Sequence, residues 1–219
     1  MDCVVFDIDD TLYLERDYVR SGFVAVGERI LQRYSIADFS DCAWALFESG
    51  VRGDIFDQAL ERVGVTKTSE LISDLVATYR QHEPAISLLP DAERALNHFG
   101  KAHKLAVITD GPVASQSAKA RALGVRQWTD DVILTGEFGP GFGKPHPRAF
   151  QLVEERTGAS GPGCVYIADN PSKDFAGPRS LNWKTVRIRR PGGLHELAPS
   201  GPDVDHEITE LSQLSGALE

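Results

Sequence analysis

The sequence has only three cysteines, Cys3, Cys42 and Cys164, and no two of them form a Cys-x-x-Cys pair. This spacing argues against a disulfide framework and a structural zinc site, because both need paired or clustered cysteines. The chain also lacks an apolar run near the roughly 18 to 20 residues of a membrane-spanning helix, and its start lacks the basic flank of a signal peptide. We therefore expect a cytoplasmic protein with reduced thiols and no membrane partner.

Positive charge is scarce as well. Lys and Arg number 23 against 32 Asp and Glu, which gives a net charge of -9. This is the wrong sign for binding a polyanion through counterion release, so we expect no nucleic acid among the partners. The 219 residues, 42% hydrophobic and 25% charged, have an ordinary globular composition. Their number allows one large domain, or one domain with a substantial insert.

Short apolar runs that stop abruptly at polar residues recur along the chain. A run of this kind indicates a buried strand that ends in a loop. The runs occupy residues 3–6, 105–108, 132–134, 164–168 and 185–188. Helix-like stretches at 113–123 and 146–157 lie between them and end at Gly124 and Gly158. This alternation predicts an α/β domain whose parallel sheet is covered by helices on both faces.

Residues 14–88 break this alternation. Their apolar residues recur with a helical period, as at Val19, Phe23, Val26 and Ile30, without a strand pattern. We expect an all-helical insert that ends in the proline-flanked stretch 84–90. The main domain then comprises residues 1–13 and 89–219. Its tail after Arg190 is predicted to be a loop followed by a short terminal helix.

Acidic and hydroxyl side chains follow the apolar runs. Asp7 and Asp9 follow the first run, Thr109 the second, and Asp169 and Asp174 the fourth. In an open parallel sheet, ligands bind beyond the carboxyl ends of the strands, where these loops converge. Clustered carboxylates need a cation between them, and Mg²⁺ prefers carboxylate oxygens together with substrate phosphate. The sequence therefore predicts a Mg²⁺ site that takes a small phosphorylated molecule.

These residues resemble the haloacid dehalogenase (HAD) superfamily. Residues 7–11 are similar to its first motif, Thr109 to the second, Lys144 to the third, and residues 169–174 to the fourth. Each match is weak alone, but their ordered set is specific and covers most of the chain. The insert lies where the first class of the superfamily carries a helical cap. The resemblance implies a three-layer Rossmann-like parallel sheet with an all-helical cap domain inserted at 14–88.

The resemblance also implies a role for each motif residue. Asp7 would attack phosphorus and form an aspartyl-phosphate, and Asp9 would act as general acid and then as base. Thr109 and Lys144 would hold the phosphoryl oxygens. The implied site residues are catalytic Asp7, Asp9, Thr109 and Lys144; substrate-binding Thr109, Asp110, Gly111 and Lys144; and Mg²⁺-binding Asp7, Asp9, Asp169 and Asp174, with Asp9 contributing its backbone carbonyl.

Two positions depart from the common family pattern. Ala168 stands where Gly often precedes the fourth-motif Asp, and Asp110 stands where a small amide such as Asn is frequent. Asp110 adds negative charge near the expected phosphate pocket, so it either contacts the substrate body or points away. Gln116 and Lys119, on the helix expected after Thr109, resemble superfamily members that dephosphorylate nucleotides or sugar phosphates.

We expect a Mg²⁺-dependent phosphatase of a small metabolite, either a sugar phosphate or a nucleotide. A sugar-phosphate mutase is an alternative, because it shares the first steps but returns the phosphoryl group to sugar; release of phosphate separates the two. A non-catalytic module that binds a phosphometabolite is a second alternative, although every expected catalytic position is filled. No Walker loop and no Gly-x-Ser-x-Gly elbow supports other chemistry. The natural substrate stays open, as does the choice between a monomer and a homodimer.

Overall fold

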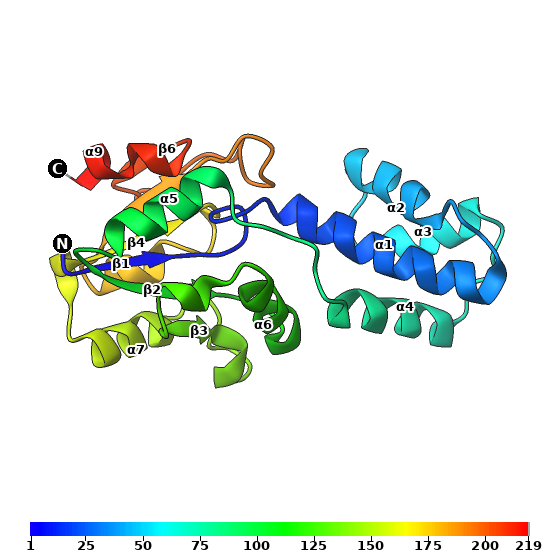
Figure 1. The fold of residues 1–219 in the computed structure, drawn as a ribbon, viewed down its shortest axis with the longest axis horizontal. Coiled ribbons are helices and arrows are strands. Elements are labelled where there is room, and N and C mark those ends of the chain that lie inside the picture. The colour runs from blue at the N-terminus through cyan, green and yellow to red at the C-terminus, as the bar shows by residue number, and fades with distance from the viewer. Residues whose placement is uncertain (219) are drawn as a thin grey trace. The chain divides into compact units, whose positions relative to one another are not determined.

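A computed structural model describes residues 1–218, and the chain divides into two compact units. The first unit comprises Met1–Arg16 and the chain from Ile86 onward, and the second comprises Asp17–Ala85. Figure 1 shows strands in the first unit and helices alone in the second. The second unit therefore starts at residue 17 and ends at residue 85, whereas the sequence predicts an insert that covers residues 14–88.

The first unit is built on a six-stranded sheet. Its strand order is β3-β2-β1-β4-β5-β6, and every neighbouring pair is parallel. The strands are β1 Cys3–Phe6, β2 Lys104–Thr109, β3 Val132–Leu134, β4 Cys164–Ala168, β5 Lys184–Ile188 and β6 His206–Ile208. The central strands are apolar and buried along their whole length, as expected when helices cover both faces.

Helices cover the sheet on two sides. They are α5 Pro90–Phe99, α6 Val113–Ala122, α7 Arg148–Thr157, α8 Ala176–Ser180 and α9 Leu214–Leu218. Figure 1 shows α5 and α7 on opposite sides of the sheet. On the α7 side, Phe150 packs edge-on against both Tyr166 and Trp183 in a fully buried cluster. The predicted three-layer α/β fold is therefore confirmed.

Two details differ from the sequence expectation. Helix α7 begins at Arg148 rather than 146, and Pro147 stands at its N-cap, where the missing N–H of proline costs nothing. The tail contains a short strand, β6, that the sequence analysis assigned to a loop. Its first two residues are exposed, so it lies at the sheet edge without the apolar run that marked the other strands.

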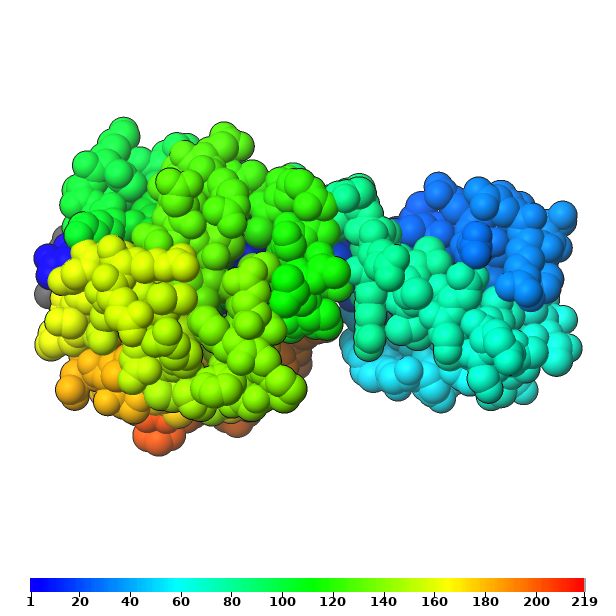
Figure 2. Space-filling model, turned by 90° about the horizontal axis from the view of Figure 1, so that it is seen from below, coloured from blue at the N-terminus to red at the C-terminus, as the bar shows by residue number. Residues whose placement is uncertain are grey.

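The second unit contains four helices and has its own core. They are α1 Glu15–Tyr34, which begins in the first unit, α2 Phe39–Glu48, α3 Ile55–Arg62 and α4 Ser69–Gln81. Phe23, Phe39, Leu46, Leu60 and Leu75 are among the residues that fill that core. Figure 2 draws this unit, in blue to cyan, as closely packed side chains. Across residues 1–218, no helix combines the length and apolarity that a bilayer crossing requires.

The strand order places a switch point between β1 and β4. The chain runs from β1 to β2 and β3 on one side, then crosses to β4, β5 and β6 on the other. Loops that leave β1 and β4 therefore diverge and open a crevice at the carboxyl edge of the sheet, the usual ligand position in such folds. Asp7 follows β1 and Asp169 follows β4, so both begin the loops at this crevice.

Candidate active site

Three aspartates from two loops meet at the switch point. Carboxylate oxygens of Asp7, Asp169 and Asp174 lie within 4.8 Å of one another, and all three residues are buried. Adjacent strands position the first two, because β1 and β4 pair in register from Cys3 with Cys164 to Phe6 with Ile167. The backbone N–H of Asn170 donates to Asp174 Oδ2 at 2.9 Å and folds the fourth-motif loop back on itself.

Lys144 is the cation of this cluster. Its Nζ lies 2.7 Å from Asp7 Oδ1 and 2.6 Å from Asp174 Oδ1, and it donates to the Tyr166 hydroxyl at 3.0 Å. Burial disfavours the ammonium, but Asp174 and Asp7 outweigh it and hold the pKa of Lys144 well above its usual range. The ammonium therefore donates hydrogen bonds to Asp7 and Tyr166 and forms an ion pair with Asp174. No sequence motif marked Tyr166.

The acidic side chains of the cluster are buried and outnumber its one cation, and this raises the pKa of two of them. Burial raises the pKa of Asp7 to about 7, against the opposing effect of Lys144. Burial, reinforced by Asp7 and Asp174, raises the pKa of Asp169 to about 9. Among residues 1–218, Asp174 Oδ1 is a buried carboxylate oxygen with no hydrogen-bond partner. The cluster therefore holds three buried carboxylates, one ammonium and a carboxylate oxygen that is available as a metal ligand. This set fits a divalent cation that prefers oxygen ligands.

Asp9 lies in a separate group of donors. Its Oδ1 accepts from the Tyr13 hydroxyl at 2.5 Å and from Lys119 Nζ at 2.7 Å, and its Oδ2 accepts from Gln116 Nε2 at 3.2 Å. Gln116 Oε1 in turn accepts from the Thr109 hydroxyl at 2.8 Å. Burial opposes ionisation, but Lys119, Tyr13 and Gln116 outweigh it, so the pKa of Asp9 is lowered. Asp9 is therefore a carboxylate in this arrangement.

These partners of Asp9 lay outside the motif residues. Gln116 and Lys119 are spaced three apart on α6 and are both buried, which places them on one face of that helix. Two buried polar residues on one helix face indicate that polar partners lie opposite them, because polar side chains are seldom buried without a hydrogen-bond partner. The sequence offered Gln116 and Lys119 as a weak family likeness, without naming Asp9 as their partner.

The end of β2 carries the other predicted substrate contacts. Thr109 is fully buried, and its hydroxyl is directed to Gln116. Gly111 adopts φ +145°, and a Cβ there would lie 2.9 Å from Gln116 Nε2, so this turn needs glycine. The Asp110 side chain is turned toward neighbouring loops: its Oδ1 accepts from the Thr135 hydroxyl at 2.5 Å and from the backbone N–H of Lys144 at 3.2 Å.

Strand β5 and the tail after it support the motif loops. Arg187, within β5, is fully buried and donates to the backbone oxygens of Asp169 in the fourth-motif loop and of His195 and Ala198 in the tail. Leu194 N–H donates to Asp10 Oδ2 at 2.7 Å, within the first motif. The tail is thus tied to both the first and the fourth motif, a role that its Pro- and Gly-rich sequence did not indicate.

Arg190 and His195 add two further ties. Arg190 donates twice to the carbonyl oxygen of Thr11, at 3.1 and 2.7 Å, and pairs with Asp91 at 2.5 Å. The imidazole Nε2 of His195 lies 2.9 Å from the side-chain nitrogen of Asn170. The tail therefore contacts the residue next to Asp169 as well as its backbone.

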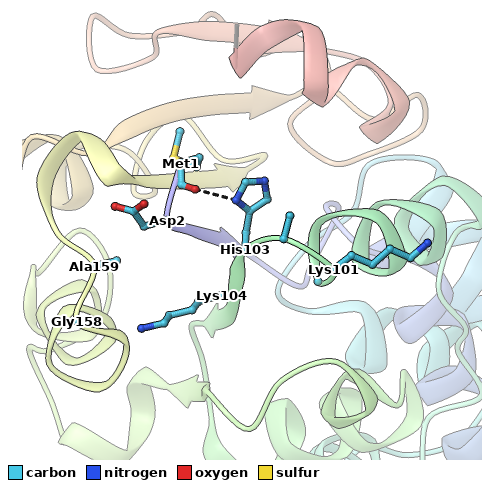
Figure 3. A pocket seen from close by; sticks show the side chains of 9 residues that line it. Met1, Asp2, Lys101, His103, Lys104, Gly158 and Ala159 are labelled. Atoms are coloured by element: carbon cyan, nitrogen blue, oxygen red, sulfur yellow. Dashed lines mark hydrogen bonds between the residues drawn. The ribbon is translucent and has the colours of Figure 1, made fainter.

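A separate cavity of about 500 Å³ lies at the opposite, amino-terminal edge of the sheet. Met1, Asp2, His103, Lys104 and Gly158 are among the residues that line it. Figure 3 shows His103 hydrogen-bonded to the Met1 carbonyl oxygen, at 2.7 Å, and Lys101 pointing away from the centre of the view. None of the motif residues lines this cavity, so it is not part of the carboxylate cluster.

Comparisons with known proteins agree with this geometry. The family model for haloacid dehalogenase-like hydrolases matches residues 1–182. The chain is 28% identical to a glyceraldehyde 3-phosphate phosphatase of Methanocaldococcus jannaschii over 96% of this chain and 94% of that protein. It is 27% identical to a phosphoserine phosphatase of Thermus thermophilus over 83% of this chain and 69% of that one.

Solved structures share the fold. The HAD-hydrolase YfnB of Bacillus subtilis, determined with bound magnesium, aligns with a TM-score of 0.67 and 19% identity, over 100% of this chain and 98% of that one. A match at this identity speaks for the fold, while the family match spans more than half of the sequence. The buried aspartates at the ends of β1 and β4, the lysine between them and the family match together show that this chain belongs to the haloacid dehalogenase-like hydrolases.

Proposed function

We propose that this protein is a phosphoric monoester hydrolase that removes the phosphate of a small metabolite through an aspartyl-phosphate on Asp7. The observation that carries the proposal is the convergence of Asp7, Asp169 and Asp174 on one buried point with Lys144 between them. A dianionic phosphate is the substrate group that a cation-loaded carboxylate cluster is suited to hold. The relatives named as phosphatases, of glyceraldehyde 3-phosphate and of phosphoserine, support the same reaction class.

Mg²⁺ is the proposed cofactor. Asp7, Asp169 and Asp174 would hold it through their carboxylates, and Asp9 would add its backbone carbonyl. When bound, the ion would neutralise charge on the transferring phosphoryl group. The observation in favour is Asp174 Oδ1, which is buried beside the carboxylates of Asp7 and Asp169 and has no hydrogen-bond partner among residues 1–218.

Asp7 and Asp9 divide the covalent and proton-transfer work. A carboxylate oxygen of Asp7 attacks phosphorus, and the bond between phosphorus and the leaving oxygen breaks as that oxygen takes a proton from Asp9. In the second half-reaction, the hydrolysis of the aspartyl-phosphate, Asp9 removes a proton from water and the water oxygen attacks phosphorus. The bond between phosphorus and the Asp7 oxygen then breaks. Phosphate is released and both aspartates return to their starting states. Asp9 is ionised in the free protein, and the bound dianionic phosphate raises its pKa so that it takes up one proton from solvent before the first half. Asp9 regains that proton from water in the second half and releases it to solvent when phosphate leaves.

Lys144 and Thr109 are the proposed phosphoryl contacts. Lys144 reaches Asp7 at 2.7 Å and so lies beside the atom that will carry the phosphoryl group. Its ammonium attracts the dianionic group, while its contact with Asp174 and Tyr166 fixes its position. The Thr109 hydroxyl ends β2 next to the same crevice and can turn from Gln116 to a phosphoryl oxygen.

The helical unit is proposed as the cap domain of the first HAD class, with residues 14–88 as its bounds. In that role it selects the leaving group, so small esters are preferred over phosphoproteins. We place the enzyme in the cytoplasm, where Cys3, Cys42 and Cys164, all free thiols, stay reduced. A sugar phosphate or a nucleotide remains the proposed substrate class. The match to glyceraldehyde 3-phosphate phosphatases over nearly the whole chain puts a three-carbon sugar phosphate first in that class.

Release of inorganic phosphate tests this function. The purified protein should release phosphate with Mg²⁺ from p-nitrophenyl phosphate and from at least one member of a panel of sugar phosphates and nucleotides, and EDTA should stop the release. Formation of a phosphate isomer without release would identify a mutase. Binding of a metabolite without either product would identify a non-catalytic module.

A further inference from the structure

Three loops meet at the carboxylate of Asp110. Thr135, which directly follows β3, donates its hydroxyl to Asp110 Oδ1 at 2.5 Å. The backbone N–H of Lys144, in the loop before α7, donates to the same oxygen at 3.2 Å. Lys173, in the fourth-motif loop, lies 3.5 Å from Asp110 Oδ2. One side chain at the end of β2 thus joins the loops that carry Lys144 and the metal-site aspartates.

The fit around Asp110 is close. Thr135 is only 2% exposed, and its hydroxyl is directed to the Asp110 carboxylate. A Cβ on Gly143 would lie 2.7 Å from Asp110 Oδ1, which means that the Lys144 loop passes the carboxylate at a distance only glycine permits. The contact therefore fixes the path of the chain immediately before Lys144.

We propose that Asp110 is a positioning residue for Lys144: it anchors the backbone of the Lys144 loop to the end of β2 and so places the Lys144 ammonium against Asp7. This role rests on the proposed function only for its effect on catalysis. It resolves the alternatives that the sequence left open, because an oxygen with two protein donors is committed to the protein and not to the substrate body.

The charge of Asp110 is consistent with this role. A carboxylate beside a phosphate pocket repels the substrate unless donors stabilise it. Burial disfavours its charged form, but the Thr135 hydroxyl, Lys173 and Lys144 outweigh burial and lower the pKa of Asp110. The negative charge of Asp110 is thereby stabilised by groups of the protein, Thr135, the Lys144 loop and Lys173. This explains how an acid is tolerated where the family often has an amide.

Four single variants and one double variant test the proposal. Asp110→Ala removes both hydrogen bonds. Thr135→Val removes one of them from a residue outside the proposed catalytic set, and Asp110→Asn keeps an oxygen that can accept both. Thr157→Val is the matched control, because Thr157 is also buried and donates its hydroxyl to a backbone oxygen, that of Val153 at 2.7 Å, at the far end of α7.

Two measurements are made on each variant. The first is kcat and KM with p-nitrophenyl phosphate and with glyceraldehyde 3-phosphate. The second is the hydrogen-exchange rate of the Lys144 backbone amide, which reports on the anchor whether or not the protein is active. Misplacement of a catalytic group by about 1 Å can cost on the order of 100-fold in rate, so we expect Thr135→Val and Asp110→Ala to lower kcat by roughly 10- to 100-fold with both substrates.

The expected pattern is specific. Asp110→Asn recovers most of the loss, Thr157→Val leaves kcat unchanged, and the Asp110→Ala/Thr135→Val double variant is no worse than Asp110→Ala alone. Lys144 amide exchange accelerates in both single variants that weaken the anchor. A Thr135→Val enzyme with unchanged kcat and amide exchange, beside an Asp110→Ala enzyme whose KM changes with one substrate only, overturns the proposal. If the parent protein releases no phosphate, the proposed function fails, and amide exchange alone still decides the anchor.

Discussion

Removing the ammonium of Lys119 is expected to convert Asp9 from a stabilised carboxylate into a buried acid that prefers its proton. The Lys119 side chain is 3% exposed, that of Asp9 is 18% exposed, and their atoms lie 2.7 Å apart. In the Lys119→Met variant, the burial that already opposes ionisation of Asp9 loses its strongest counterweight. The pKa of Asp9, lowered in the parent protein, should rise above its usual range.

The magnitude follows from the kind of pair that is broken. Loss of one partner of a buried ion pair costs about 3 to 5 kcal/mol when the other stays charged. Asp9 keeps the Tyr13 and Gln116 hydrogen bonds, so we expect the lower end, about 3 kcal/mol at pH 8. For a chain of this size, this loss lowers the melting temperature by roughly 6 to 12 °C.

The direction of the stability change with pH follows from the shift in the pKa of Asp9. In the parent protein the pKa of Asp9 is lowered on folding, so its contribution is present above about pH 4 and is lost as pH falls further. In Lys119→Met a raised pKa reverses this, because the folded state then retains a proton that the unfolded chain releases. The variant should therefore lose less stability at pH 5 than at pH 8. Because Asp9 must be protonated to act as general acid, the alkaline limb of the kcat/KM profile should move to higher pH.

Thermal melts at pH 5 and pH 8, together with kcat/KM from pH 4 to pH 9, measure both effects. Lys67→Met is the matched control, because Lys67 pairs with Asp57 in an exposed position, with side chains 62% and 35% exposed. It should change stability by less than about 1 kcal/mol and leave the pH–rate profile in place. An equal drop in melting temperature at both pH values, with a pH–rate profile that superimposes on the parent's, would refute the reasoning.

Three further predictions concern the nucleophile, the metal site and the helical unit. Asp7→Asn should abolish phosphate release while circular dichroism stays unchanged; full turnover would remove Asp7 as nucleophile. Because the pKa of Asp7 rises to about 7 and that of Asp169 to about 9, metal-free protein should lose stability as pH rises from 5 to 9. Mg²⁺ should restore more of that stability at pH 8 than at pH 6, and melts in EDTA with no pH trend would contradict this. Gly22→Ala places a Cβ 2.4 Å from the Tyr79 ring and should cost about 1 to 3 kcal/mol, whereas Val24→Ala, at an exposed site, should cost almost none.

The sequence predicted those strands that are buried on both faces, because such strands consist almost entirely of apolar residues. The runs at 3–6, 132–134 and 164–168 became β1, β3 and β4 with those bounds. The short strand β6 could not be found in this way. Its first two residues are exposed, so pairing with β5 rather than an apolar run defines it, whereas the other edge strand, β3, is buried along its length.

The candidate site divides along similar lines. Asp7 and Asp169 could be placed together from the sequence, because adjacent parallel strands end at one edge. Their neighbours could not, because Lys119 lies 110 residues from Asp9 along the chain and the pairing depends on how α6 is rotated. The burial of Arg187 could not be predicted from the sequence either, since most arginines are exposed.

The ties made by the tail mean that the stretch matched by the family does not stand alone. A fragment ending at residue 182 would retain every motif, yet it would lack Arg187, Arg190 and Leu194, which hold the Asp169 carbonyl, the Thr11 carbonyl and the Asp10 carboxylate. The two parts of the chain are mutually dependent: the first dozen residues carry Asp7 and Asp9, the proposed nucleophile and proton-transfer group, and residues after 182 hold the backbone and side chains next to them in place.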